Sequence, residues 1–209
     1  QVRVYASSTF ISGLVTATGS PYAGSTISFS GYEVSSPDQG EFYTLAASGS
    51  APASKLQLYD SIILHKTAAS SSFAVRPSFF GQVESKRTSF ENWYEIQFRN
   101  ATNTLEDIVL TNMGRGFFPS VAQGASTTFN TIKSRKITEG GLYSTSTAKF
   151  TVTALDISEV GQQDIKLFNY NATTTLVNST FNTANLQFNG SGSGGLERSF
   201  TVDLTIVDT

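Results

Sequence analysis

The chain has 209 residues, enough to bury a real core in one large β-domain or two small ones. Its 14 basic and 16 acidic residues give a net charge of −2, and only 14% of all residues are charged. The nearest approach to a basic patch is Lys133, Arg135 and Lys136, too short a cluster to neutralise a phosphate backbone. We therefore expect no nucleic-acid partner.

The chain contains no cysteine, which excludes disulfides and thiolate metal sites. No run reaches the roughly 18 apolar residues of a membrane span, so no membrane-spanning segment is expected. Ser, Thr, Gly and Asn replace much of the usual Lys and Glu, and this pH-insensitive surface favours an extracellular or cell-surface location. We interpret Gln1 as the mature N-terminus after signal-peptide removal, although a trimmed chain would begin in the same way.

Residues 1–18 form a strand-prone arm that ends before the break at Gly19, Ser20 and Pro21. One interpretation makes this arm the first strand of its own domain. The other makes it a donor strand, whose backbone pairs with a neighbouring subunit while its apolar side chains fill alternate pockets there. The residues that would fill those pockets are Val2, Val4, Ala6, Phe10, Ile11, Leu14 and Val15.

Alternating apolar and polar residues then predict one strand after another, separated by Gly, Ser, Asn and Pro. The first predicted strands cover residues 27–30, 42–45, 56–59 and 61–65. The run 61–65 is apolar almost throughout, which is typical of a strand buried on both faces.

The middle of the chain predicts a β-hairpin. Tyr94, Ile96 and Phe98 alternate with polar residues, a turn is expected over 100–104, and an apolar strand returns over 108–110.

Further strands are predicted over 150–155, 165–168, 186–188 and 200–206, with a flexible loop over 189–195. In the last strand Phe200, Val202, Leu204 and Ile206 share one face, which predicts a half-buried strand. No composition break divides residues 19–209. We therefore predict an all-β protein with one Ig-like or jelly-roll-like β-sandwich head, preceded by the extended N-terminal arm.

N-glycosylation sequons are a second feature of the predicted turns and strand ends. An N-linked glycan requires the pattern Asn-X-Ser/Thr on an accessible surface of a secreted protein. The four candidate acceptors are Asn100, Asn171, Asn178 and Asn189.

Residues suited to catalysis are sparse. His65 is the only histidine and lies in an apolar run, and the carboxylates are scattered. We expect no catalytic residue, no metal, no cofactor apart from glycans, and no enzymatic activity. Four aromatic residues could form a sugar-stacking platform, but core packing is the favoured interpretation: Trp93, Tyr94, Phe117 and Phe118.

The predicted hairpin over 94–112, the β-prone arm, the sequons, the low charge and the absence of cysteine together resemble archaeal surface-filament subunits. The closest resemblance is to the thread filaments of Sulfolobus-like thermoacidophiles, although no single motif is specific to them. The resemblance implies donor-strand complementation by the arm, heavy N-glycosylation and identical subunits joined head to tail. Four sequons are modest for such a filament.

The sequence therefore favours a structural subunit of an extracellular pilus-like filament that serves adhesion or cell-cell contact. Its expected partners are identical subunits, and beyond them surfaces or other cells. A monomeric carbohydrate-binding or adhesin β-sandwich, using aromatics near Trp93 or Phe117, is the alternative. A capsid or surface-layer protein assembled through its faces is a third.

Overall fold

The computed structural model describes a series of ranges that begins at residue 26 and ends at residue 202. The described ranges are 26–30, 33–36, 43–44, 55–60, 62–65, 78–79, 82–98, 102–119, 126–146, 148–168, 173–190, 192 and 194–202. The predicted donor-strand arm and the sequons at Asn100 and Asn171 lie outside these residues.

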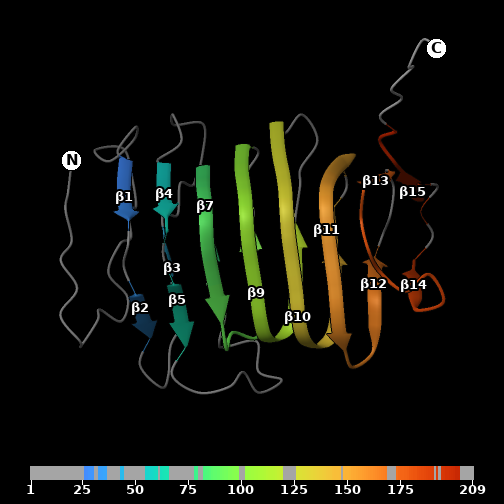
Figure 1. Cartoon of the computed structure of the whole chain (residues 1–209), viewed down its shortest axis with the longest axis horizontal. Helices are drawn as coiled ribbons and strands as arrows, with labels where there is room; N and C mark the ends of the chain where they lie inside the picture. Colours follow the sequence, from blue (N-terminus) through green and yellow to red (C-terminus); the bar gives the residue numbers. More distant parts are fainter. Residues whose placement is uncertain are drawn as a thin grey trace, which may run out of the picture.

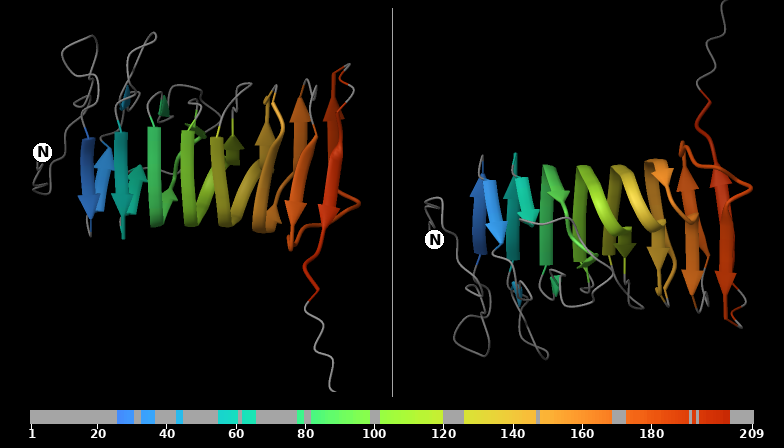
Figure 2. Two further views of the ribbon diagram at one scale, coloured as in Figure 1. Left: turned by 90° about the horizontal axis from the view of Figure 1, so that it is seen from above. Right: turned by 90° about the horizontal axis from the view of Figure 1, so that it is seen from below.

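The described residues form a β-solenoid, in which the chain winds in successive coils and the strands of neighbouring coils lie side by side (Figures 1 and 2). The first seven strands are β1 (Thr26–Ser30), β2 (Glu33–Ser36), β3 (Tyr43–Thr44), β4 (Lys55–Tyr59), β5 (Ile62–His65), β6 (Ser78–Phe79) and β7 (Gln82–Glu91). The next four are β8 (Ile96–Phe98), β9 (Thr102–Pro119), β10 (Ser126–Ser144) and β11 (Phe150–Val160). The last four are β12 (Gln163–Phe168), β13 (Thr174–Val177), β14 (Leu186–Asn189) and β15 (Leu196–Ser199).

Every described strand pairing is parallel. One ladder runs in the order β1-β4-β7-β9-β10-β11-β13-β15, and the later parts of the coils pair in ladders of their own. Phe129 of β10, for example, lies beside Val152 of β11, and Val152 lies beside Leu176 of β13. Because parallel strands need a long connection, the rest of each coil serves as the crossover between one ladder strand and the next.

The predicted Ig-like or jelly-roll-like sandwich is therefore wrong, although the all-β class is right. The predicted hairpin is also wrong, because β8 pairs in parallel with the end of β9, where Ile96 lies beside Phe117. Alternation of apolar and polar residues misled the prediction, since it is the same in a sandwich strand and in a solenoid strand.

Two further predicted strands differ from the structure in exposure. Ile62, in the run expected to be buried on both faces, is 41% exposed. Phe200 and Val202, expected on a half-buried strand, are 61% and 72% exposed, and residues 200–202 are not in a strand.

The coils turn at residues with left-handed backbone conformation, which line up in two columns. The first corner column follows the in-register series Tyr59, Lys86, Glu106, Asn130, Thr153 and Val177. Its members, with φ from 50° to 55°, are Asp60, Arg87, Asp107, Thr131, Ala154 and Asn178. The second column, with φ from 55° to 63°, is Asn92, Asn112, Lys136 and Glu159. A single left-handed residue bends an extended chain sharply, so the described coils that share a column bend at equivalent positions.

The core lies inside the coils. In β7, β9, β10 and β11 four residues lie between the two corners, and the first and third point inward, as Ile132 and Ser134 do in β10. Aromatic rings continue the core along the solenoid: Phe129 packs edge-to-face against Phe117 at 5.0 Å and against Phe150 at 6.1 Å between ring centroids. One contiguous apolar cluster therefore extends from Leu58 to Phe181.

Engineered cysteines can test this parallel register, because the chain has none of its own. Thr104 of β9 and Thr128 of β10 are register partners, and Thr151 of β11 continues the column one coil later, because its neighbour Val152 pairs with Phe129. We expect a Thr104→Cys/Thr128→Cys variant to form an intramolecular disulfide on mild oxidation, because adjacent strands meet the required Cα separation of about 4.4–6.8 Å. The readout is thiol titration together with peptide mass spectrometry.

The control variant is Thr104→Cys/Thr151→Cys, whose two positions are separated by a whole coil. It should remain reduced, since two strand spacings of about 4.8 Å exceed the reach of a disulfide. Equal oxidation of both pairs, or of neither, would contradict the solenoid register.

Candidate functional site

The predicted aromatic platform is not exposed. Trp93, Tyr94, Phe117 and Phe118 are at most 5% exposed, so the core-packing interpretation of these residues is confirmed. Within the described ranges no three His, Cys, Asp or Glu residues gather as a metal site would require. No helix in the described part of the chain could span a membrane.

The most elaborate polar cluster surrounds Arg115 of β9. Its guanidinium donates to Glu95 at 2.7 Å and to Glu139 of β10 at 2.9 Å. The Tyr94 hydroxyl donates to the same Glu139 carboxylate at 2.8 Å. Arg115 also stacks on the Tyr143 ring, 4.0 Å from its centroid. The Arg115 cluster therefore ties three neighbouring coils together.

Burial controls the electrostatics of this cluster. The Glu95 side chain is fully buried and that of Arg115 is 12% exposed. Burial raises the pKa of the Tyr94 hydroxyl, and its hydrogen bond to Glu139 raises it further. Burial also raises the pKa of Tyr143, and this effect outweighs the positive charge of Arg115, which lowers that pKa. Both phenols therefore stay neutral and can act as hydrogen-bond donors at ordinary pH.

Glycines flanking Arg115 make room for the cluster. A Cβ atom at Gly114 would overlap the Tyr94 ring, and one at Gly116 would overlap the Gly141 carbonyl oxygen. The pattern Gly-Arg-Gly followed by two phenylalanines was thus the available sequence signal for a close-packed arginine. The Arg115 cluster itself was not predicted, because its acidic partners are 20 and 24 residues away along the chain.

A buried ion pair is most damaging when only one partner is removed. We therefore expect Arg115→Met to lower the free energy of unfolding by about 3–5 kcal/mol, because the buried Glu95 carboxylate loses its cationic partner. Urea denaturation followed by circular dichroism measures this loss.

The matched control is Arg135→Met, which removes an ion pair with Asp156 whose side chains are 42% and 36% exposed. Exposed pairs contribute at most about 1 kcal/mol. Similar small losses for both variants would show that the Arg115 cluster is not a structural clamp.

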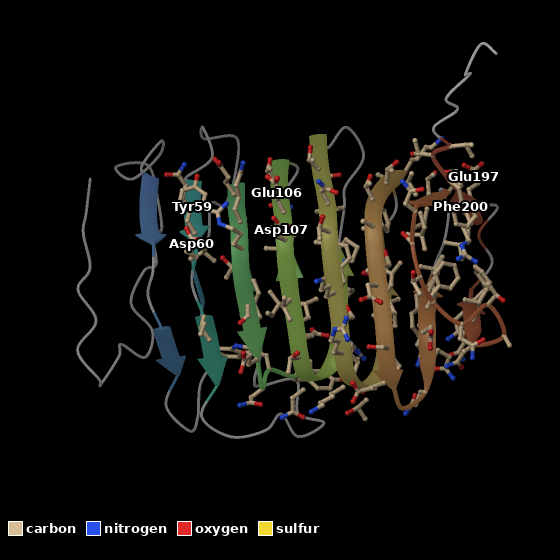
Figure 3. All side chains as sticks on the ribbon, viewed as in Figure 1. Tyr59, Asp60, Glu106, Asp107, Glu197 and Phe200 are labelled. Atoms are coloured by element: carbon tan, nitrogen blue, oxygen red, sulfur yellow. The ribbon has the colours of Figure 1, made fainter. Side chains whose placement is uncertain are left out.

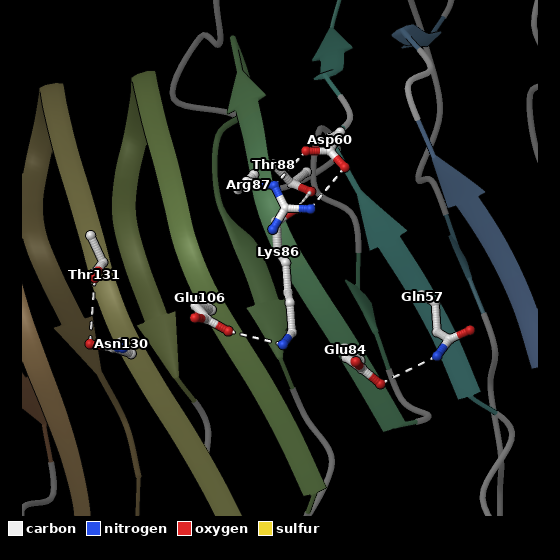
Figure 4. Close-up of polar contacts among 9 residues, drawn as sticks. All are labelled: Gln57, Asp60, Glu84, Lys86, Arg87, Thr88, Glu106, Asn130 and Thr131. Atoms are coloured by element: carbon white, nitrogen blue, oxygen red, sulfur yellow. Dashed lines mark hydrogen bonds and ion pairs between the residues drawn. The ribbon is translucent and has the colours of Figure 1, made fainter.

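A second polar series covers the outward face of β4, β7 and β9 (Figure 4). Gln57 donates to Glu84 at 3.3 Å, and Lys86 pairs with Glu106 at 3.0 Å. At the first corner column Arg87 makes a two-point contact with Asp60, at 2.5 and 2.9 Å. Each contact joins neighbouring coils, and the two ion pairs also balance charge locally, so this series stabilises the solenoid surface.

The C-terminal end of the solenoid differs from the rest. Phe188 of β14 lies beside Leu167 of β12, yet Phe188 is 42% exposed and Leu167 only 2%. Phe200 and Val202 are exposed at the same end, where Figure 3 labels Phe200 near Glu197. We call Phe188, Phe200, Val202 and strand β15 the C-terminal end surface.

One edge of β15 pairs with β13, and the other edge faces away from β13. In the described part of the chain β15 pairs only with β13, where the carbonyls of Gly195 and Ser199 accept backbone N–H bonds. Alternate residues of a strand direct their backbone groups to opposite sides. The N–H and C=O groups of Leu196 and Arg198 therefore point to the side of β15 away from β13.

The described sequon residues differ in accessibility. Asn178 is exposed at the first corner column, and its side chain exchanges two hydrogen bonds with Thr201. Asn189 is half-buried at the end of β14. Glycosylation of all four sequons stays a prediction.

Comparison with known proteins identifies no relative: no protein-family model matches the chain, and no curated protein or solved structure matches it.

Proposed function

We propose that this protein is a structural subunit of an extracellular pilus-like filament that serves adhesion or cell-cell contact. The observation that carries the proposal is the long parallel ladder, whose terminal strands β1 and β15 each have one partner among the described residues. An unpaired strand edge is a template for another strand, and proteins that stay monomeric usually cover or charge such edges.

Polarity favours an open chain of subunits. Because every described pairing is parallel, the edge at β1 and the edge at β15 are different surfaces. Contact between two different surfaces is heterologous, and when it does not close into a ring it produces a filament. The parallel ladder then forms the body of each subunit, and its two end strands form the contact between subunits.

The surface chemistry supports an extracellular location. Some exposed outward positions on β10 and β11 carry uncharged side chains, such as Thr128 and Thr151, next to charged ones such as Lys133. Charged residues are few in the whole chain, and an unglycosylated surface of this kind relies on Ser, Thr and Asn for solubility. N-linked glycans at the sequons would add to that solubility, and we propose them as part of the mature protein.

The resemblance to thread-type archaeal filaments adds a role for the N-terminal arm. A sandwich with a missing strand would receive the arm in a gap between two strands, whereas a solenoid offers strand edges only at its ends. We propose that the arm contributes to the joint between subunits at such an end.

The carbohydrate-binding alternative relied on exposed aromatic rings near Trp93 or Phe117. These two residues are 1% and 0% exposed, so they cannot stack on a sugar. A sugar-binding site of this protein would have to use other residues. The expectation that the protein is not an enzyme stays a prediction.

The full chain should form filaments in solution. We expect uniform thin filaments by negative-stain electron microscopy, and a mass that increases with protein concentration by light scattering. The arm variant Val4→Asp/Ile11→Asp should assemble at least tenfold less, because charge on its apolar face opposes docking.

Thr151→Asp is the control, since it adds a charge at an exposed position in the middle of the solenoid. A full chain that remains monomeric at every concentration would contradict the filament proposal. Normal assembly of the arm variant would show that the arm is not part of the joint, and the filament proposal would stand.

A further inference from the structure

Four side chains on the outward face of β12 and β14 lie close together. In β12, Lys166 and Phe168 are half-buried and alternate with buried residues that point into the core. In the neighbouring strand β14, Gln187 is the register partner of Lys166. Asn189 is the register partner of Phe168. Neighbouring strands are about 4.8 Å apart, so these four residues share one small surface, which we call the β12–β14 patch.

The Phe168 ring is the apolar part of this patch. It contacts the Tyr143 ring of β10, at 5.1 Å between centroids and 34° between ring planes. The Lys166 ammonium lies 5.4 Å from the Phe168 centroid. Because β12 lies between β10 and β14, Tyr143 is on one side of Phe168 and Asn189 is on the other. A group attached to Asn189 therefore starts beside the Phe168 ring.

Gln187 adds a hydrogen-bond acceptor to the patch. Its Oε1 atom is buried and has no hydrogen-bond partner. A buried carbonyl oxygen without a donor is unfavourable, so such an atom in a folded protein calls for an explanation. The neighbouring Lys166 ammonium supplies donors. The patch thus combines an apolar ring, a cationic donor and an unused acceptor, and these are the contacts that a sugar ring with its hydroxyl groups makes.

Asn189 is placed to carry such a sugar, because it begins the sequon Asn-Gly-Ser. Its side-chain amide makes no hydrogen bond within the part of the chain that the structure describes. The other described sequon residue differs: Asn178 Nδ2 donates to Thr201 Oγ1 at 3.1 Å, and Asn178 Oδ1 accepts from the Thr201 N–H at 2.8 Å. A glycan replaces one N–H of the amide nitrogen, so it would compete with the Thr201 contact at Asn178. At Asn189 it displaces no such contact.

We infer that the β12–β14 patch holds the first sugar of an N-linked glycan on Asn189. The C–H face of the sugar lies against Phe168, and its hydroxyl groups face Lys166 and Gln187. This inference rests on the proposed extracellular function, and it gives one of the proposed glycans a binding surface on the protein.

The covalent step is the ordinary transfer from an activated, lipid-linked sugar phosphate. The Asn189 Nδ2 atom forms a bond to the anomeric carbon of the sugar and loses one proton. The bond from that carbon to the phosphate oxygen breaks, and the phosphate leaves with the electron pair. No oxidant or reductant takes part.

Four proteins test the packing: the full chain, Asn189→Gln, Phe168→Leu and the double variant. Each is secreted from yeast and trimmed enzymatically to the first N-acetylglucosamine of every glycan. Glycopeptide mass spectrometry measures the occupancy of Asn189, and circular dichroism measures Tm. We expect a glycan on Asn189, and we expect Asn189→Gln to lower the Tm by about 2–4 °C, because the contact between sugar and ring is lost. With Leu at position 168 the same change should have almost no effect, since the ring is already absent.

The control is the same four proteins from a bacterium that makes no N-glycans. There Asn189→Gln should leave the Tm unchanged with either residue at position 168, which separates the effect of the sugar from that of the asparagine side chain. Phe168→Tyr keeps an aromatic ring and should preserve the shift in the yeast protein. Unchanged circular dichroism spectra will confirm that each variant folds.

An Asn189 without a glycan would overturn the inference. An equal Tm shift with Phe and Leu at position 168, or the same shift in the bacterial proteins, would overturn it as well. None of these results bears on the filament proposal, which electron microscopy of the full chain tests separately. A full chain that shows the Phe168-dependent shift but stays monomeric would contradict the filament and leave the Asn189 site standing.

Discussion

The left-handed corner residues are the constraint on which the rest of this structure depends. Each coil must bend at equivalent places for its strands to meet those of its neighbours in register. The first corner column achieves this with six non-glycine residues at positive φ, including β-branched Thr131. Such a conformation costs about 1–3 kcal/mol per residue and persists only when the surroundings impose it. Here the parallel ladders on both sides of each corner and the continuous core impose it.

Once the corners are aligned, the position of a residue along its coil decides whether its side chain points into the core or outward. Inward positions form the apolar core, as with Phe129 and Val152, and outward positions carry the ion pairs that link neighbouring coils. The Arg115 cluster is an exception, since it buries charge between coils and satisfies it with two carboxylates. At the C-terminal end Phe188 is 42% exposed, although its register partner Leu167 is buried.

The sequence alone was sufficient for the all-β class and for several strand positions. Alternation located strands near 56–59, 150–155 and 165–168, which correspond to β4, β11 and β12. It could not distinguish a sandwich from a solenoid, because alternation records only which side chains share a face. The repeat was hidden because one inward column contains residues as different as Ser85, Leu105, Phe129 and Val152. The corners were hidden too: Arg87, Thr131 and Ala154 are not residue types that indicate left-handed backbone. The C-terminal end surface was misread for a related reason, since the alternation from Phe200 onward looked like a half-buried strand.

Fibre diffraction from aligned filaments tests the parallel solenoid and the proposed head-to-tail stacking of subunits together. Strands stacked along the filament axis predict a meridional reflection at about 4.8 Å, the spacing between neighbouring strands. That reflection on the meridian is the result we expect. The same spacing on the equator, or no strand reflection along the axis, would contradict the coaxial arrangement.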